Sequence, residues 1–235
     1  MATIRKNQAN LTQQEWQAFI NAISGLRGLG TPTPRYGAFV DVHVRAMTAA
    51  GMSWGVHTMQ GMVGRNFLAW HRRFILRFEE QVQKIDPLVS LPYWNTVKNP
   101  QIPGALNTPA FVSSWGLIRF WNPAFLPTAS DVASVKARTN FVSFQTMLER
   151  IHGGVHNAVG GPDPALGGQM AGPNSPADPL FWLHHANIDR IWAEWQVNNP
   201  TKNPPNLTET LKPSPIIKGK VQKYVRISTL GYSYA

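Results

Sequence analysis

The sequence predicts a mainly α protein, a helical bundle with long ordered loops and little β structure. Several segments repeat apolar residues at intervals of three and four, which places them on one face of a helix. The segments between them are rich in Gly, Pro and isolated aromatic residues. Hydrophobic residues make up 43% of the chain, and nine tryptophans are present. These features are typical of a globular bundle with heavy aromatic packing.

The first predicted helix begins at Thr12 and continues through Ile23. Its start, Thr12-Gln-Gln-Glu15, has the pattern of a capping box, in which two side chains each accept a backbone N–H. A loop over 25–34 separates it from a second helix, predicted over 36–50. Apolar residues and one histidine follow an inward stripe of this second helix, as expected for a helix that packs on a core.

A third helix is predicted over 66–84, and Asp86-Pro87 ends it because proline cannot continue a helix. The Gly- and Met-rich stretch 51–64 before it is expected to be irregular. Residues 87–138 contain many prolines and isolated aromatics, so we expect long ordered loops with short helical turns.

A fourth helix is predicted over 141–157, and the loop over 162–176 is rich in Gly and Pro. A fifth helix is predicted over 178–197, since its Asp-Pro start supplies a cap followed by proline at the first helical position. The tail is Pro-rich and then favours β structure over 216–227.

Composition predicts one domain over residues 1–235, because no shift in composition divides the chain. No apolar run approaches the roughly 18 residues of a membrane span, and the N-terminus lacks the apolar core of a signal peptide. The chain has no cysteine, so redox chemistry does not choose a compartment. Localisation therefore stays open between the cytoplasm and export without a visible signal peptide.

The formal charge is +10, from 22 Lys and Arg against 12 Asp and Glu. A basic chain raises the question of nucleic-acid binding. Its basic residues are scattered, however, with Arg72-Arg73 as the one central pair and a looser cluster over 212–226. We expect neither a nucleic-acid nor a membrane partner. Attraction of an anionic partner and a solvated basic face both stay open.

Histidines gather in apolar surroundings. The stretches 152–156 and 178–189 contain four of the seven histidines, and His71 lies in an equally apolar string. Burying imidazoles is costly unless their nitrogens find partners, and one metal ion is a partner for several at once. Without thiolates, an all-imidazole site favours copper over zinc, calcium or iron–sulfur.

Helical spacing groups these histidines. His152 and His156 are four residues apart, so both side chains leave one face of a helix. A further ligand must come from another helix, and His184 or His185 is available at the apolar start of the fifth. The remaining three histidines, His43, His57 and His71, precede residue 72. Together with the three or four after residue 151, they are enough for two three-histidine sites.

Other metal chemistries fit less well. Gly153 stands where the zinc-protease motif has its Glu, so that chemistry lacks its base. A di-iron bundle needs inward carboxylates, and few lie on the relevant helices. Spacing alone leaves two readings open: a two-metal histidine site, and a set of structural histidines in a core.

Three strings extend this pattern: Phe67-Leu-Ala-Trp-His-Arg-Arg-Phe, His152-x-x-x-His156, and Asp178-Pro-x-Phe-Trp-Leu-His-His-x-Asn-x-Asp189-Arg-Ile-Trp. In this order they resemble the type-3 dicopper family of tyrosinases, catechol oxidases and hemocyanins, most strongly the short bacterial tyrosinases. Arg5-Lys-Asn and Tyr232-x-Tyr234 resemble the elements that bracket the family's catalytic core. The resemblance implies a four-helix bundle that holds a dicopper centre.

The resemblance also implies the ligand sets. His43, His57 and His71 would hold the first copper, and His152, His156 and His185 the second. Family members usually place the second ligand of the first copper nine residues before the third. That position is Met62 here, and the candidate His57 lies fourteen residues before His71. His184 would then orient a ligand or approach the substrate.

With O2 as co-substrate, such a centre oxidises o-diphenols to o-quinones, and true tyrosinases first hydroxylate monophenols. Glu149 matches the family's Glu that orients a water. The Asn that usually accompanies it does not match cleanly, because Gly153 follows His152 and Asn157 follows His156. Asn174 matches a residue above the coppers, so Asn174, Gly153 and His184 are candidates for substrate binding.

The expected partners are small phenols and catechols, with a separate copper-delivery protein as a further candidate. The chain ends directly after its closing Tyr motif, so we expect no C-terminal plug domain. Three alternatives to a tyrosinase stay open: a catechol oxidase, an o-aminophenol oxidase, and a hemocyanin-like O2-binding protein.

Overall fold

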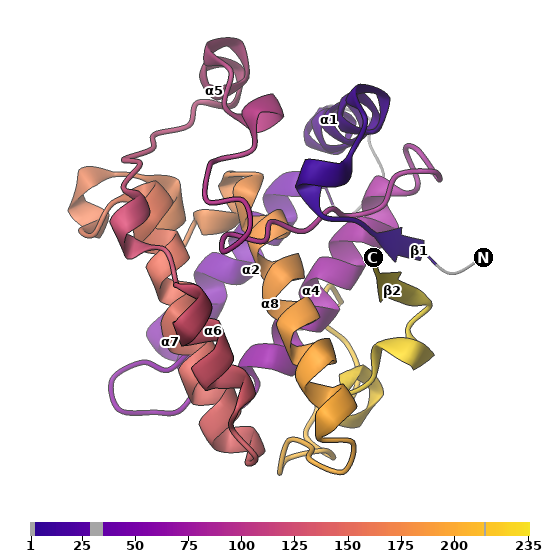
Figure 1. The fold of residues 1–235 in the computed structure, drawn as a ribbon, viewed down its shortest axis with the longest axis vertical. Helices are drawn as coiled ribbons and strands as arrows, with labels where there is room; N and C mark the ends of the chain where they lie inside the picture. The colour runs from indigo at the N-terminus through magenta and orange to yellow at the C-terminus, as the bar shows by residue number, and fades with distance from the viewer. Residues whose placement is uncertain (1–2, 29–34, 214) are drawn as a thin grey trace.

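The computed structural model describes residues 3–28, 35–213 and 215–235. Four helices surround the centre of the molecule: α2 (Tyr36–Ala46), α4 (Phe67–Val82), α7 (Phe141–Gly160) and α8 (Leu180–Asn198). Helices α4, α7 and α8 all pack on one another. Figure 1 shows α8 crossing in front of α4, with α7 along one side. The predicted mainly α bundle is confirmed.

Aromatic packing joins these helices. The ring of Trp182 on α8 stacks on Phe78 of α4, with centroids 3.7 Å apart and planes 4° from parallel. Its indole N–H donates to the hydroxyl of Tyr36 on α2 at 2.9 Å. Most residues of α8 are buried around its whole circumference, as expected of a central helix. One aromatic layer therefore fixes three of the helices against one another.

Shorter elements cover the bundle. Helix α1 (Gln13–Arg27) begins with the predicted capping box of Thr12 and Glu15. The other α-helices are α3 (Ala49–Met52), α5 (Pro109–Trp115) and α6 (Ala129–Lys136). The 3-10 helices are η1 (Gln8–Asn10), η2 (Gly104–Leu106), η3 (Pro123–Phe125), η4 (Pro164–Leu166), η5 (Gln169–Ala171), η6 (Ser175–Ala177), η7 (Val221–Tyr224) and η8 (Ile227–Thr229). Among the described residues, no helix is both long and apolar enough to cross a bilayer.

The prediction of one helix over 36–50 is wrong at its end. Helix α2 stops at Ala46, and Thr48 caps a separate short helix by accepting the Gly51 N–H. The chain turns back so closely that a Cβ at Gly51 would lie 1.9 Å from the Arg45 carbonyl oxygen. The bend thus depends on a close backbone approach that only glycine permits.

The β structure predicted over 216–227 is also wrong. This segment forms η7 and η8, because Val221 and Tyr224 are buried against α4. The carbonyl oxygens of Tyr224 and Val225 accept hydrogen bonds from Arg72 and so are not free for a strand ladder. The strands instead lie at the chain ends, where β1 (Thr3–Arg5) pairs in parallel with β2 (Tyr232–Tyr234).

A buried charge network lies beneath these two strands. The Arg5 guanidinium donates to Glu79 of α4 at 2.6 Å and to Asp189 of α8 at 3.4 Å. Asp189 also accepts from Arg72, and from the Tyr232 hydroxyl at 2.7 Å. All the carboxylates and guanidinium groups in this network are at most 3% exposed. The network therefore ties both chain ends to α4 and α8.

Replacing Asp189 with asparagine is expected to lower the free energy of unfolding by about 3–5 kcal/mol, because two buried guanidinium groups lose a shared carboxylate. Urea unfolding followed by tryptophan fluorescence measures this change. Tyr234→Phe is the matched control: it removes one hydroxyl that donates to Asp189 and accepts from Arg5, leaves every charge in place, and should cost only about 1–2 kcal/mol. Equal stability of Asp189→Asn and the parent chain would contradict an anchoring role.

Candidate metal centre

The six histidines singled out in the sequence form two triads at the centre of the bundle. Within each triad, the potential ligand nitrogens all lie within 4.8 Å of one another. The first triad is His43, His57 and His71, and the second is His152, His156 and His185. Three nitrogens held about 2 Å from one ion lie about 3.5 Å apart in a trigonal arrangement. The spacing in each triad therefore suits a single ion.

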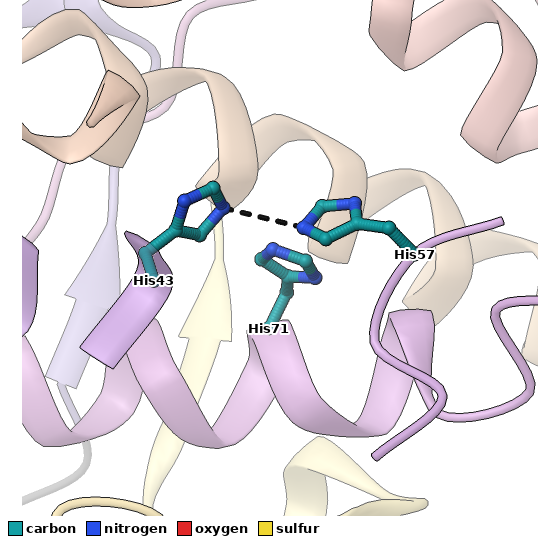
Figure 2. A group of neighbouring side chains, drawn as sticks. All are labelled: His43, His57 and His71. Carbon is teal, nitrogen blue, oxygen red and sulfur yellow. Dashed lines mark hydrogen bonds between the residues drawn. The ribbon is translucent and has the colours of Figure 1, made fainter. Parts of the chain in front are cut away.

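Three different elements supply the first triad. His43 comes from α2, His71 from α4, and His57 from the loop between α3 and α4. Figure 2 shows their rings converging on one point, with the Nε2 atoms of His43 and His57 3.3 Å apart. The unusual distance of His57 from His71 along the chain is therefore no obstacle to its place in the triad.

The second triad combines one turn of α7 with the start of α8. His152 and His156 have their Nε2 atoms 2.9 Å apart, as their four-residue spacing predicts. The Nε2 atom of His185 lies 3.2 Å from that of His152. Of the adjacent pair on α8, His185 and not His184 completes the triad.

The two triads face each other across a short gap. The rings of His71 and His185 stack with centroids 4.2 Å apart and planes 14° from parallel. His57 and His152 also face each other, with ring centroids 6.3 Å apart. Two ions that share a substrate oxygen typically lie about 3.5–4 Å apart. The facing triads are therefore close enough for a two-metal centre.

Backbone carbonyls hold three of the rings in one orientation. The Nδ1–H groups of His43, His71 and His156 donate to the carbonyls of Pro173 at 2.6 Å, Phe67 at 2.9 Å and Met170 at 2.5 Å, respectively. Each bond leaves the Nε2 lone pair directed inward, which is how a protein fixes the tautomer of a metal-binding histidine.

Unsatisfied nitrogens test whether a metal fits. Among the described residues, the inward Nε2 of His71 is buried and has no hydrogen-bond partner. In both triads, pairs of Nε2 atoms lie 2.9–3.3 Å apart. Two nitrogens that both present a lone pair repel each other and cannot form a hydrogen bond. Such crowding is costly in a dry core unless a cation lies between the nitrogens. The donor set is all imidazole and contains no thiolate, which fits copper.

Burial controls the protonation of the cluster. It lowers the pKa of His43 and of His156 to about 4, although the carbonyl partner of each opposes the shift. Burial also lowers the pKa of the other four triad histidines well below the usual value, and neighbouring imidazoles add to the effect. The rings are therefore neutral near pH 7, the form that binds a metal.

His184 lies outside both triads. Its ring stacks on His152 with centroids 5.0 Å apart and planes 13° from parallel, and the side chain is only 1% exposed. Neither ring nitrogen has a hydrogen-bond partner of normal geometry within the described part of the chain. Burial lowers the pKa of His184 well below its usual value, which the backbone of His152 partly opposes. Its contacts are therefore with a triad ring.

Glu149 lies one turn before His152 on α7 and contacts the loop of the first triad. Its carboxylate accepts the backbone N–H of Thr58 at 2.6 Å and the Thr58 hydroxyl at 2.8 Å. Burial raises the pKa of this carboxyl group, and the two Thr58 bonds oppose the rise. Since Thr58 directly follows His57, Glu149 connects α7 to the histidine supplied by the loop.

Two of the candidate substrate residues, Gly153 and Asn157, adjoin the second triad along the chain, and Asn174 adjoins the first. A Cβ built at Gly153 meets no atom of the described residues within 4 Å, so the space beyond this glycine is open. Asn157 is half-buried, directly after His156. Asn174 is exposed and follows Pro173, whose carbonyl orients His43.

Sequence reasoning missed several contributors. Phe181 packs on His185 and His43, with ring centroids 4.1 and 5.1 Å apart. The sequence does contain a signal for Phe181, because it lies four residues before His185 in the string Asp-Pro-Leu-Phe-Trp-Leu-His-His. The carbonyls that orient the rings carry no signal in the sequence, because every residue has one. Thr58 would have been found only by asking what holds the irregular segment around His57.

Comparison with known proteins identifies the family. The sequence model of the common central domain of tyrosinase matches residues 33–119 and 119–198. The chain belongs to the tyrosinase family. A tyrosinase of Streptomyces antibioticus is 35% identical over 262 aligned residues, which cover 90% of this chain and 92% of that protein. A tyrosinase of Streptomyces glaucescens is 33% identical, with 84% of each chain covered.

Solved structures agree on the tyrosinase-family fold. A functional unit of octopus hemocyanin superposes with a TM-score of 0.78 at 23% identity, covering 99% of this chain and 68% of that one. A polyphenol oxidase of Thermothelomyces thermophila gives a TM-score of 0.76 at 18% identity, covering 100% and 89%. The family match and the curated relatives make the protein a copper-dependent oxidoreductase of the tyrosinase and polyphenol oxidase class. Its cofactor is a pair of copper ions.

Proposed function

We propose that the protein hydroxylates monophenols and oxidises o-diphenols to o-quinones, with O2 as the oxidant. The observation that carries this proposal is the pair of facing, buried histidine triads. The similarity to two Streptomyces tyrosinases over most of the chain supports it. Two bound copper ions would supply the redox chemistry that activates O2.

The ligand assignment is part of the proposal. His43, His57 and His71 hold one ion, and His152, His156 and His185 hold the other. The inward Nε2 lone pairs and the unpartnered Nε2 of His71 support these two sets. His184 acts as a positioning residue, because it stacks on His152 and its ring nitrogens are buried.

We assign proton handling to Glu149. A phenol binds a metal far better as phenolate, yet its pKa is near 10 in water, so hydroxylation needs a proton acceptor. Each Glu149 oxygen accepts one bond from Thr58 and keeps a further lone pair for a water. Its raised pKa favours accepting a proton from that water. Asn157 is the candidate second partner of the water.

The open space at Gly153 indicates where the phenol ring lies. A substrate there approaches His152 without meeting a side chain at this position. Asn174 adds an exposed amide beside the first triad. We propose that these two residues leave room for ring substituents and that Asn174 contacts polar ones.

Turnover of L-tyrosine and L-DOPA by the copper-loaded protein tests the proposal, with the absorbance of the quinone product as the readout. We expect both substrates to be oxidised. Glu149→Gln should lower turnover of L-tyrosine at least about tenfold more than that of L-DOPA, because only the monophenol step needs the extra proton acceptor.

Three outcomes would each contradict part of the proposal. Oxidation of L-DOPA alone would make the protein a catechol oxidase and remove the hydroxylation step. Reversible O2 binding without turnover of either phenol would make it an oxygen carrier. Equal losses for both substrates in Glu149→Gln would leave Glu149 only its structural contact with Thr58.

A further inference from the structure

The segment between His57 and α4 forms a small hairpin. Met59 and Met62 exchange backbone hydrogen bonds of 3.0 and 2.9 Å. The two residues between them, Gln60 and Gly61, have φ values of 48° and 81°. Positive φ at both central positions is characteristic of the type I′ turn that closes a two-residue hairpin. The loop protrudes from the body at the lower left of Figure 1.

Hairpin register places the two methionines together. Residues that exchange both backbone bonds have Cα atoms about 5.5 Å apart and side chains on the same face. Met62 is 45% exposed and Met59 is half-buried. Neither belongs to the apolar residues that form or line the core in the described part of the chain. Two flexible thioethers therefore stand side by side at the surface.

The base of the hairpin is clamped beside the first triad. Thr58 is bonded to Glu149 through both its N–H and its hydroxyl, and the hydroxyl also accepts the Gly64 N–H at 3.0 Å. A Cβ at Gly64 would lie 2.8 Å from backbone atoms of His57 and Thr58, so the closure needs glycine. The hairpin is thereby held next to His57 and is not a free loop.

His57 is the first-triad histidine nearest the surface. His43 and His71 are each only 2% exposed, whereas His57 is half-buried. Met59 follows His57 by only two residues, and Thr58 between them is fixed to Glu149, so the hairpin begins directly beside this histidine. A ligand leaving the thioethers therefore meets His57 before the two buried histidines.

The chemistry of the pair selects its ligand. Thioethers are soft donors that favour Cu(I) among biological metals. Four of the seven methionines in the chain fall between residues 47 and 62. All four lie in the segment that runs from α2, which carries His43, to the start of α4. We propose that Met59 and Met62 form a transient Cu(I) docking site that passes the ion to His57 during loading of the first triad.

This proposal rests on the proposed function only in that the first triad binds copper. The transfer is an exchange of neutral ligands: Cu(I) leaves two sulfur atoms for imidazole nitrogens, with no change in oxidation state and no proton transfer. The docking site affects the rate of loading, and the histidines determine the final occupancy.

Loading kinetics test the docking site in the copper-free full-length chain. Cu(I) is supplied as its coloured bicinchoninate complex, and the fall in absorbance gives the transfer rate. Met59→Leu/Met62→Leu should load at least about fivefold more slowly, since leucine keeps the volume but has no soft donor. Met52→Leu, a half-buried methionine of the same segment outside the hairpin, is the matched control and should load at the parent rate.

A second measurement is independent of loading. Ag(I), a redox-inert analogue of Cu(I), should shift the methyl resonances of Met59 and Met62 in the parent chain before it shifts those of other methionines. Final copper content should be equal in the double variant and the parent chain. Unchanged loading in the double variant would overturn the proposal, as would a lower final copper content, which would make the methionines resident ligands.

The remaining outcomes separate the two proposals. A double variant that loads at the parent rate but has a higher KM for phenols would make the hairpin an apolar rim of the substrate site, and would overturn the docking proposal. A parent chain that loads through the methionines but oxidises no phenol would overturn the proposed function and support the docking site.

Discussion

Replacing His57 with alanine is expected to reduce the copper content from two ions per chain to one and to abolish most phenol oxidation. The substitution removes the one ligand of the first triad that comes from a loop. Groups that only orient a metal ligand are worth about 10–100-fold in affinity or activity, so loss of a ligand itself should cost at least about a hundredfold. Metal analysis and quinone formation measure the two effects.

His184→Phe is the matched control for His57→Ala. It removes a histidine from the same buried cluster but keeps a ring to stack on His152. We expect this variant to retain both copper ions. If His57→Ala also retained both, a different residue would complete the first site. Met62 would be the first to examine, because it stands at the spacing usual for the family.

Acidification is expected to destabilise the copper-free protein steeply between pH 6.5 and about pH 4. In the unfolded chain each histidine takes up a proton near pH 6.5. In the folded protein burial lowers the pKa of His43 and His156 to about 4, and that of the other buried histidines further. The unfolded state therefore binds more protons in this window, so the free energy of unfolding falls as pH falls.

The size of this effect follows from the number of buried rings. Each histidine whose pKa is lowered by burial reduces the free energy of unfolding by about 1.4 kcal/mol for every pH unit of acidification across the window. Several groups acting together approach the whole stability of a domain, about 5–15 kcal/mol. Urea midpoints near pH 7.5 and pH 5.5 should thus differ strongly for the copper-free chain and less for the copper-loaded one, because bound metal keeps the rings neutral. Equal midpoints for the copper-free chain would show that the histidines protonate without unfolding.

Local signals predicted the helices well. The capping box at Thr12 is formed, and the helix expected to start at the Asp178-Pro179 step is α8. The four-residue spacing of His152 and His156 was enough to place both in one triad, because a helix brings such residues onto one face. These predictions hold because each depends on residues within one or two turns of each other.

The wrong predictions depended on distant contacts. Residues 216–227 favour β structure locally, yet Arg72 on α4 takes two of their carbonyls and α4 buries their apolar side chains. The second helix ends early because the chain must approach its own backbone at Gly51. The local propensity of a segment for helix or strand is a weak influence, and tertiary packing overrides it in both cases.

The sequence by itself determined which chemistry was available: seven imidazoles and no thiolate favour copper, while their spacing alone left a two-metal site and a set of structural histidines both open. Only the tertiary structure decided that His57 belongs to the first triad, that His185 and not His184 completes the second, and that backbone carbonyls orient the rings. Residue type sets which atoms can bind a metal. Whether those atoms converge depends on how segments far apart in the chain pack together.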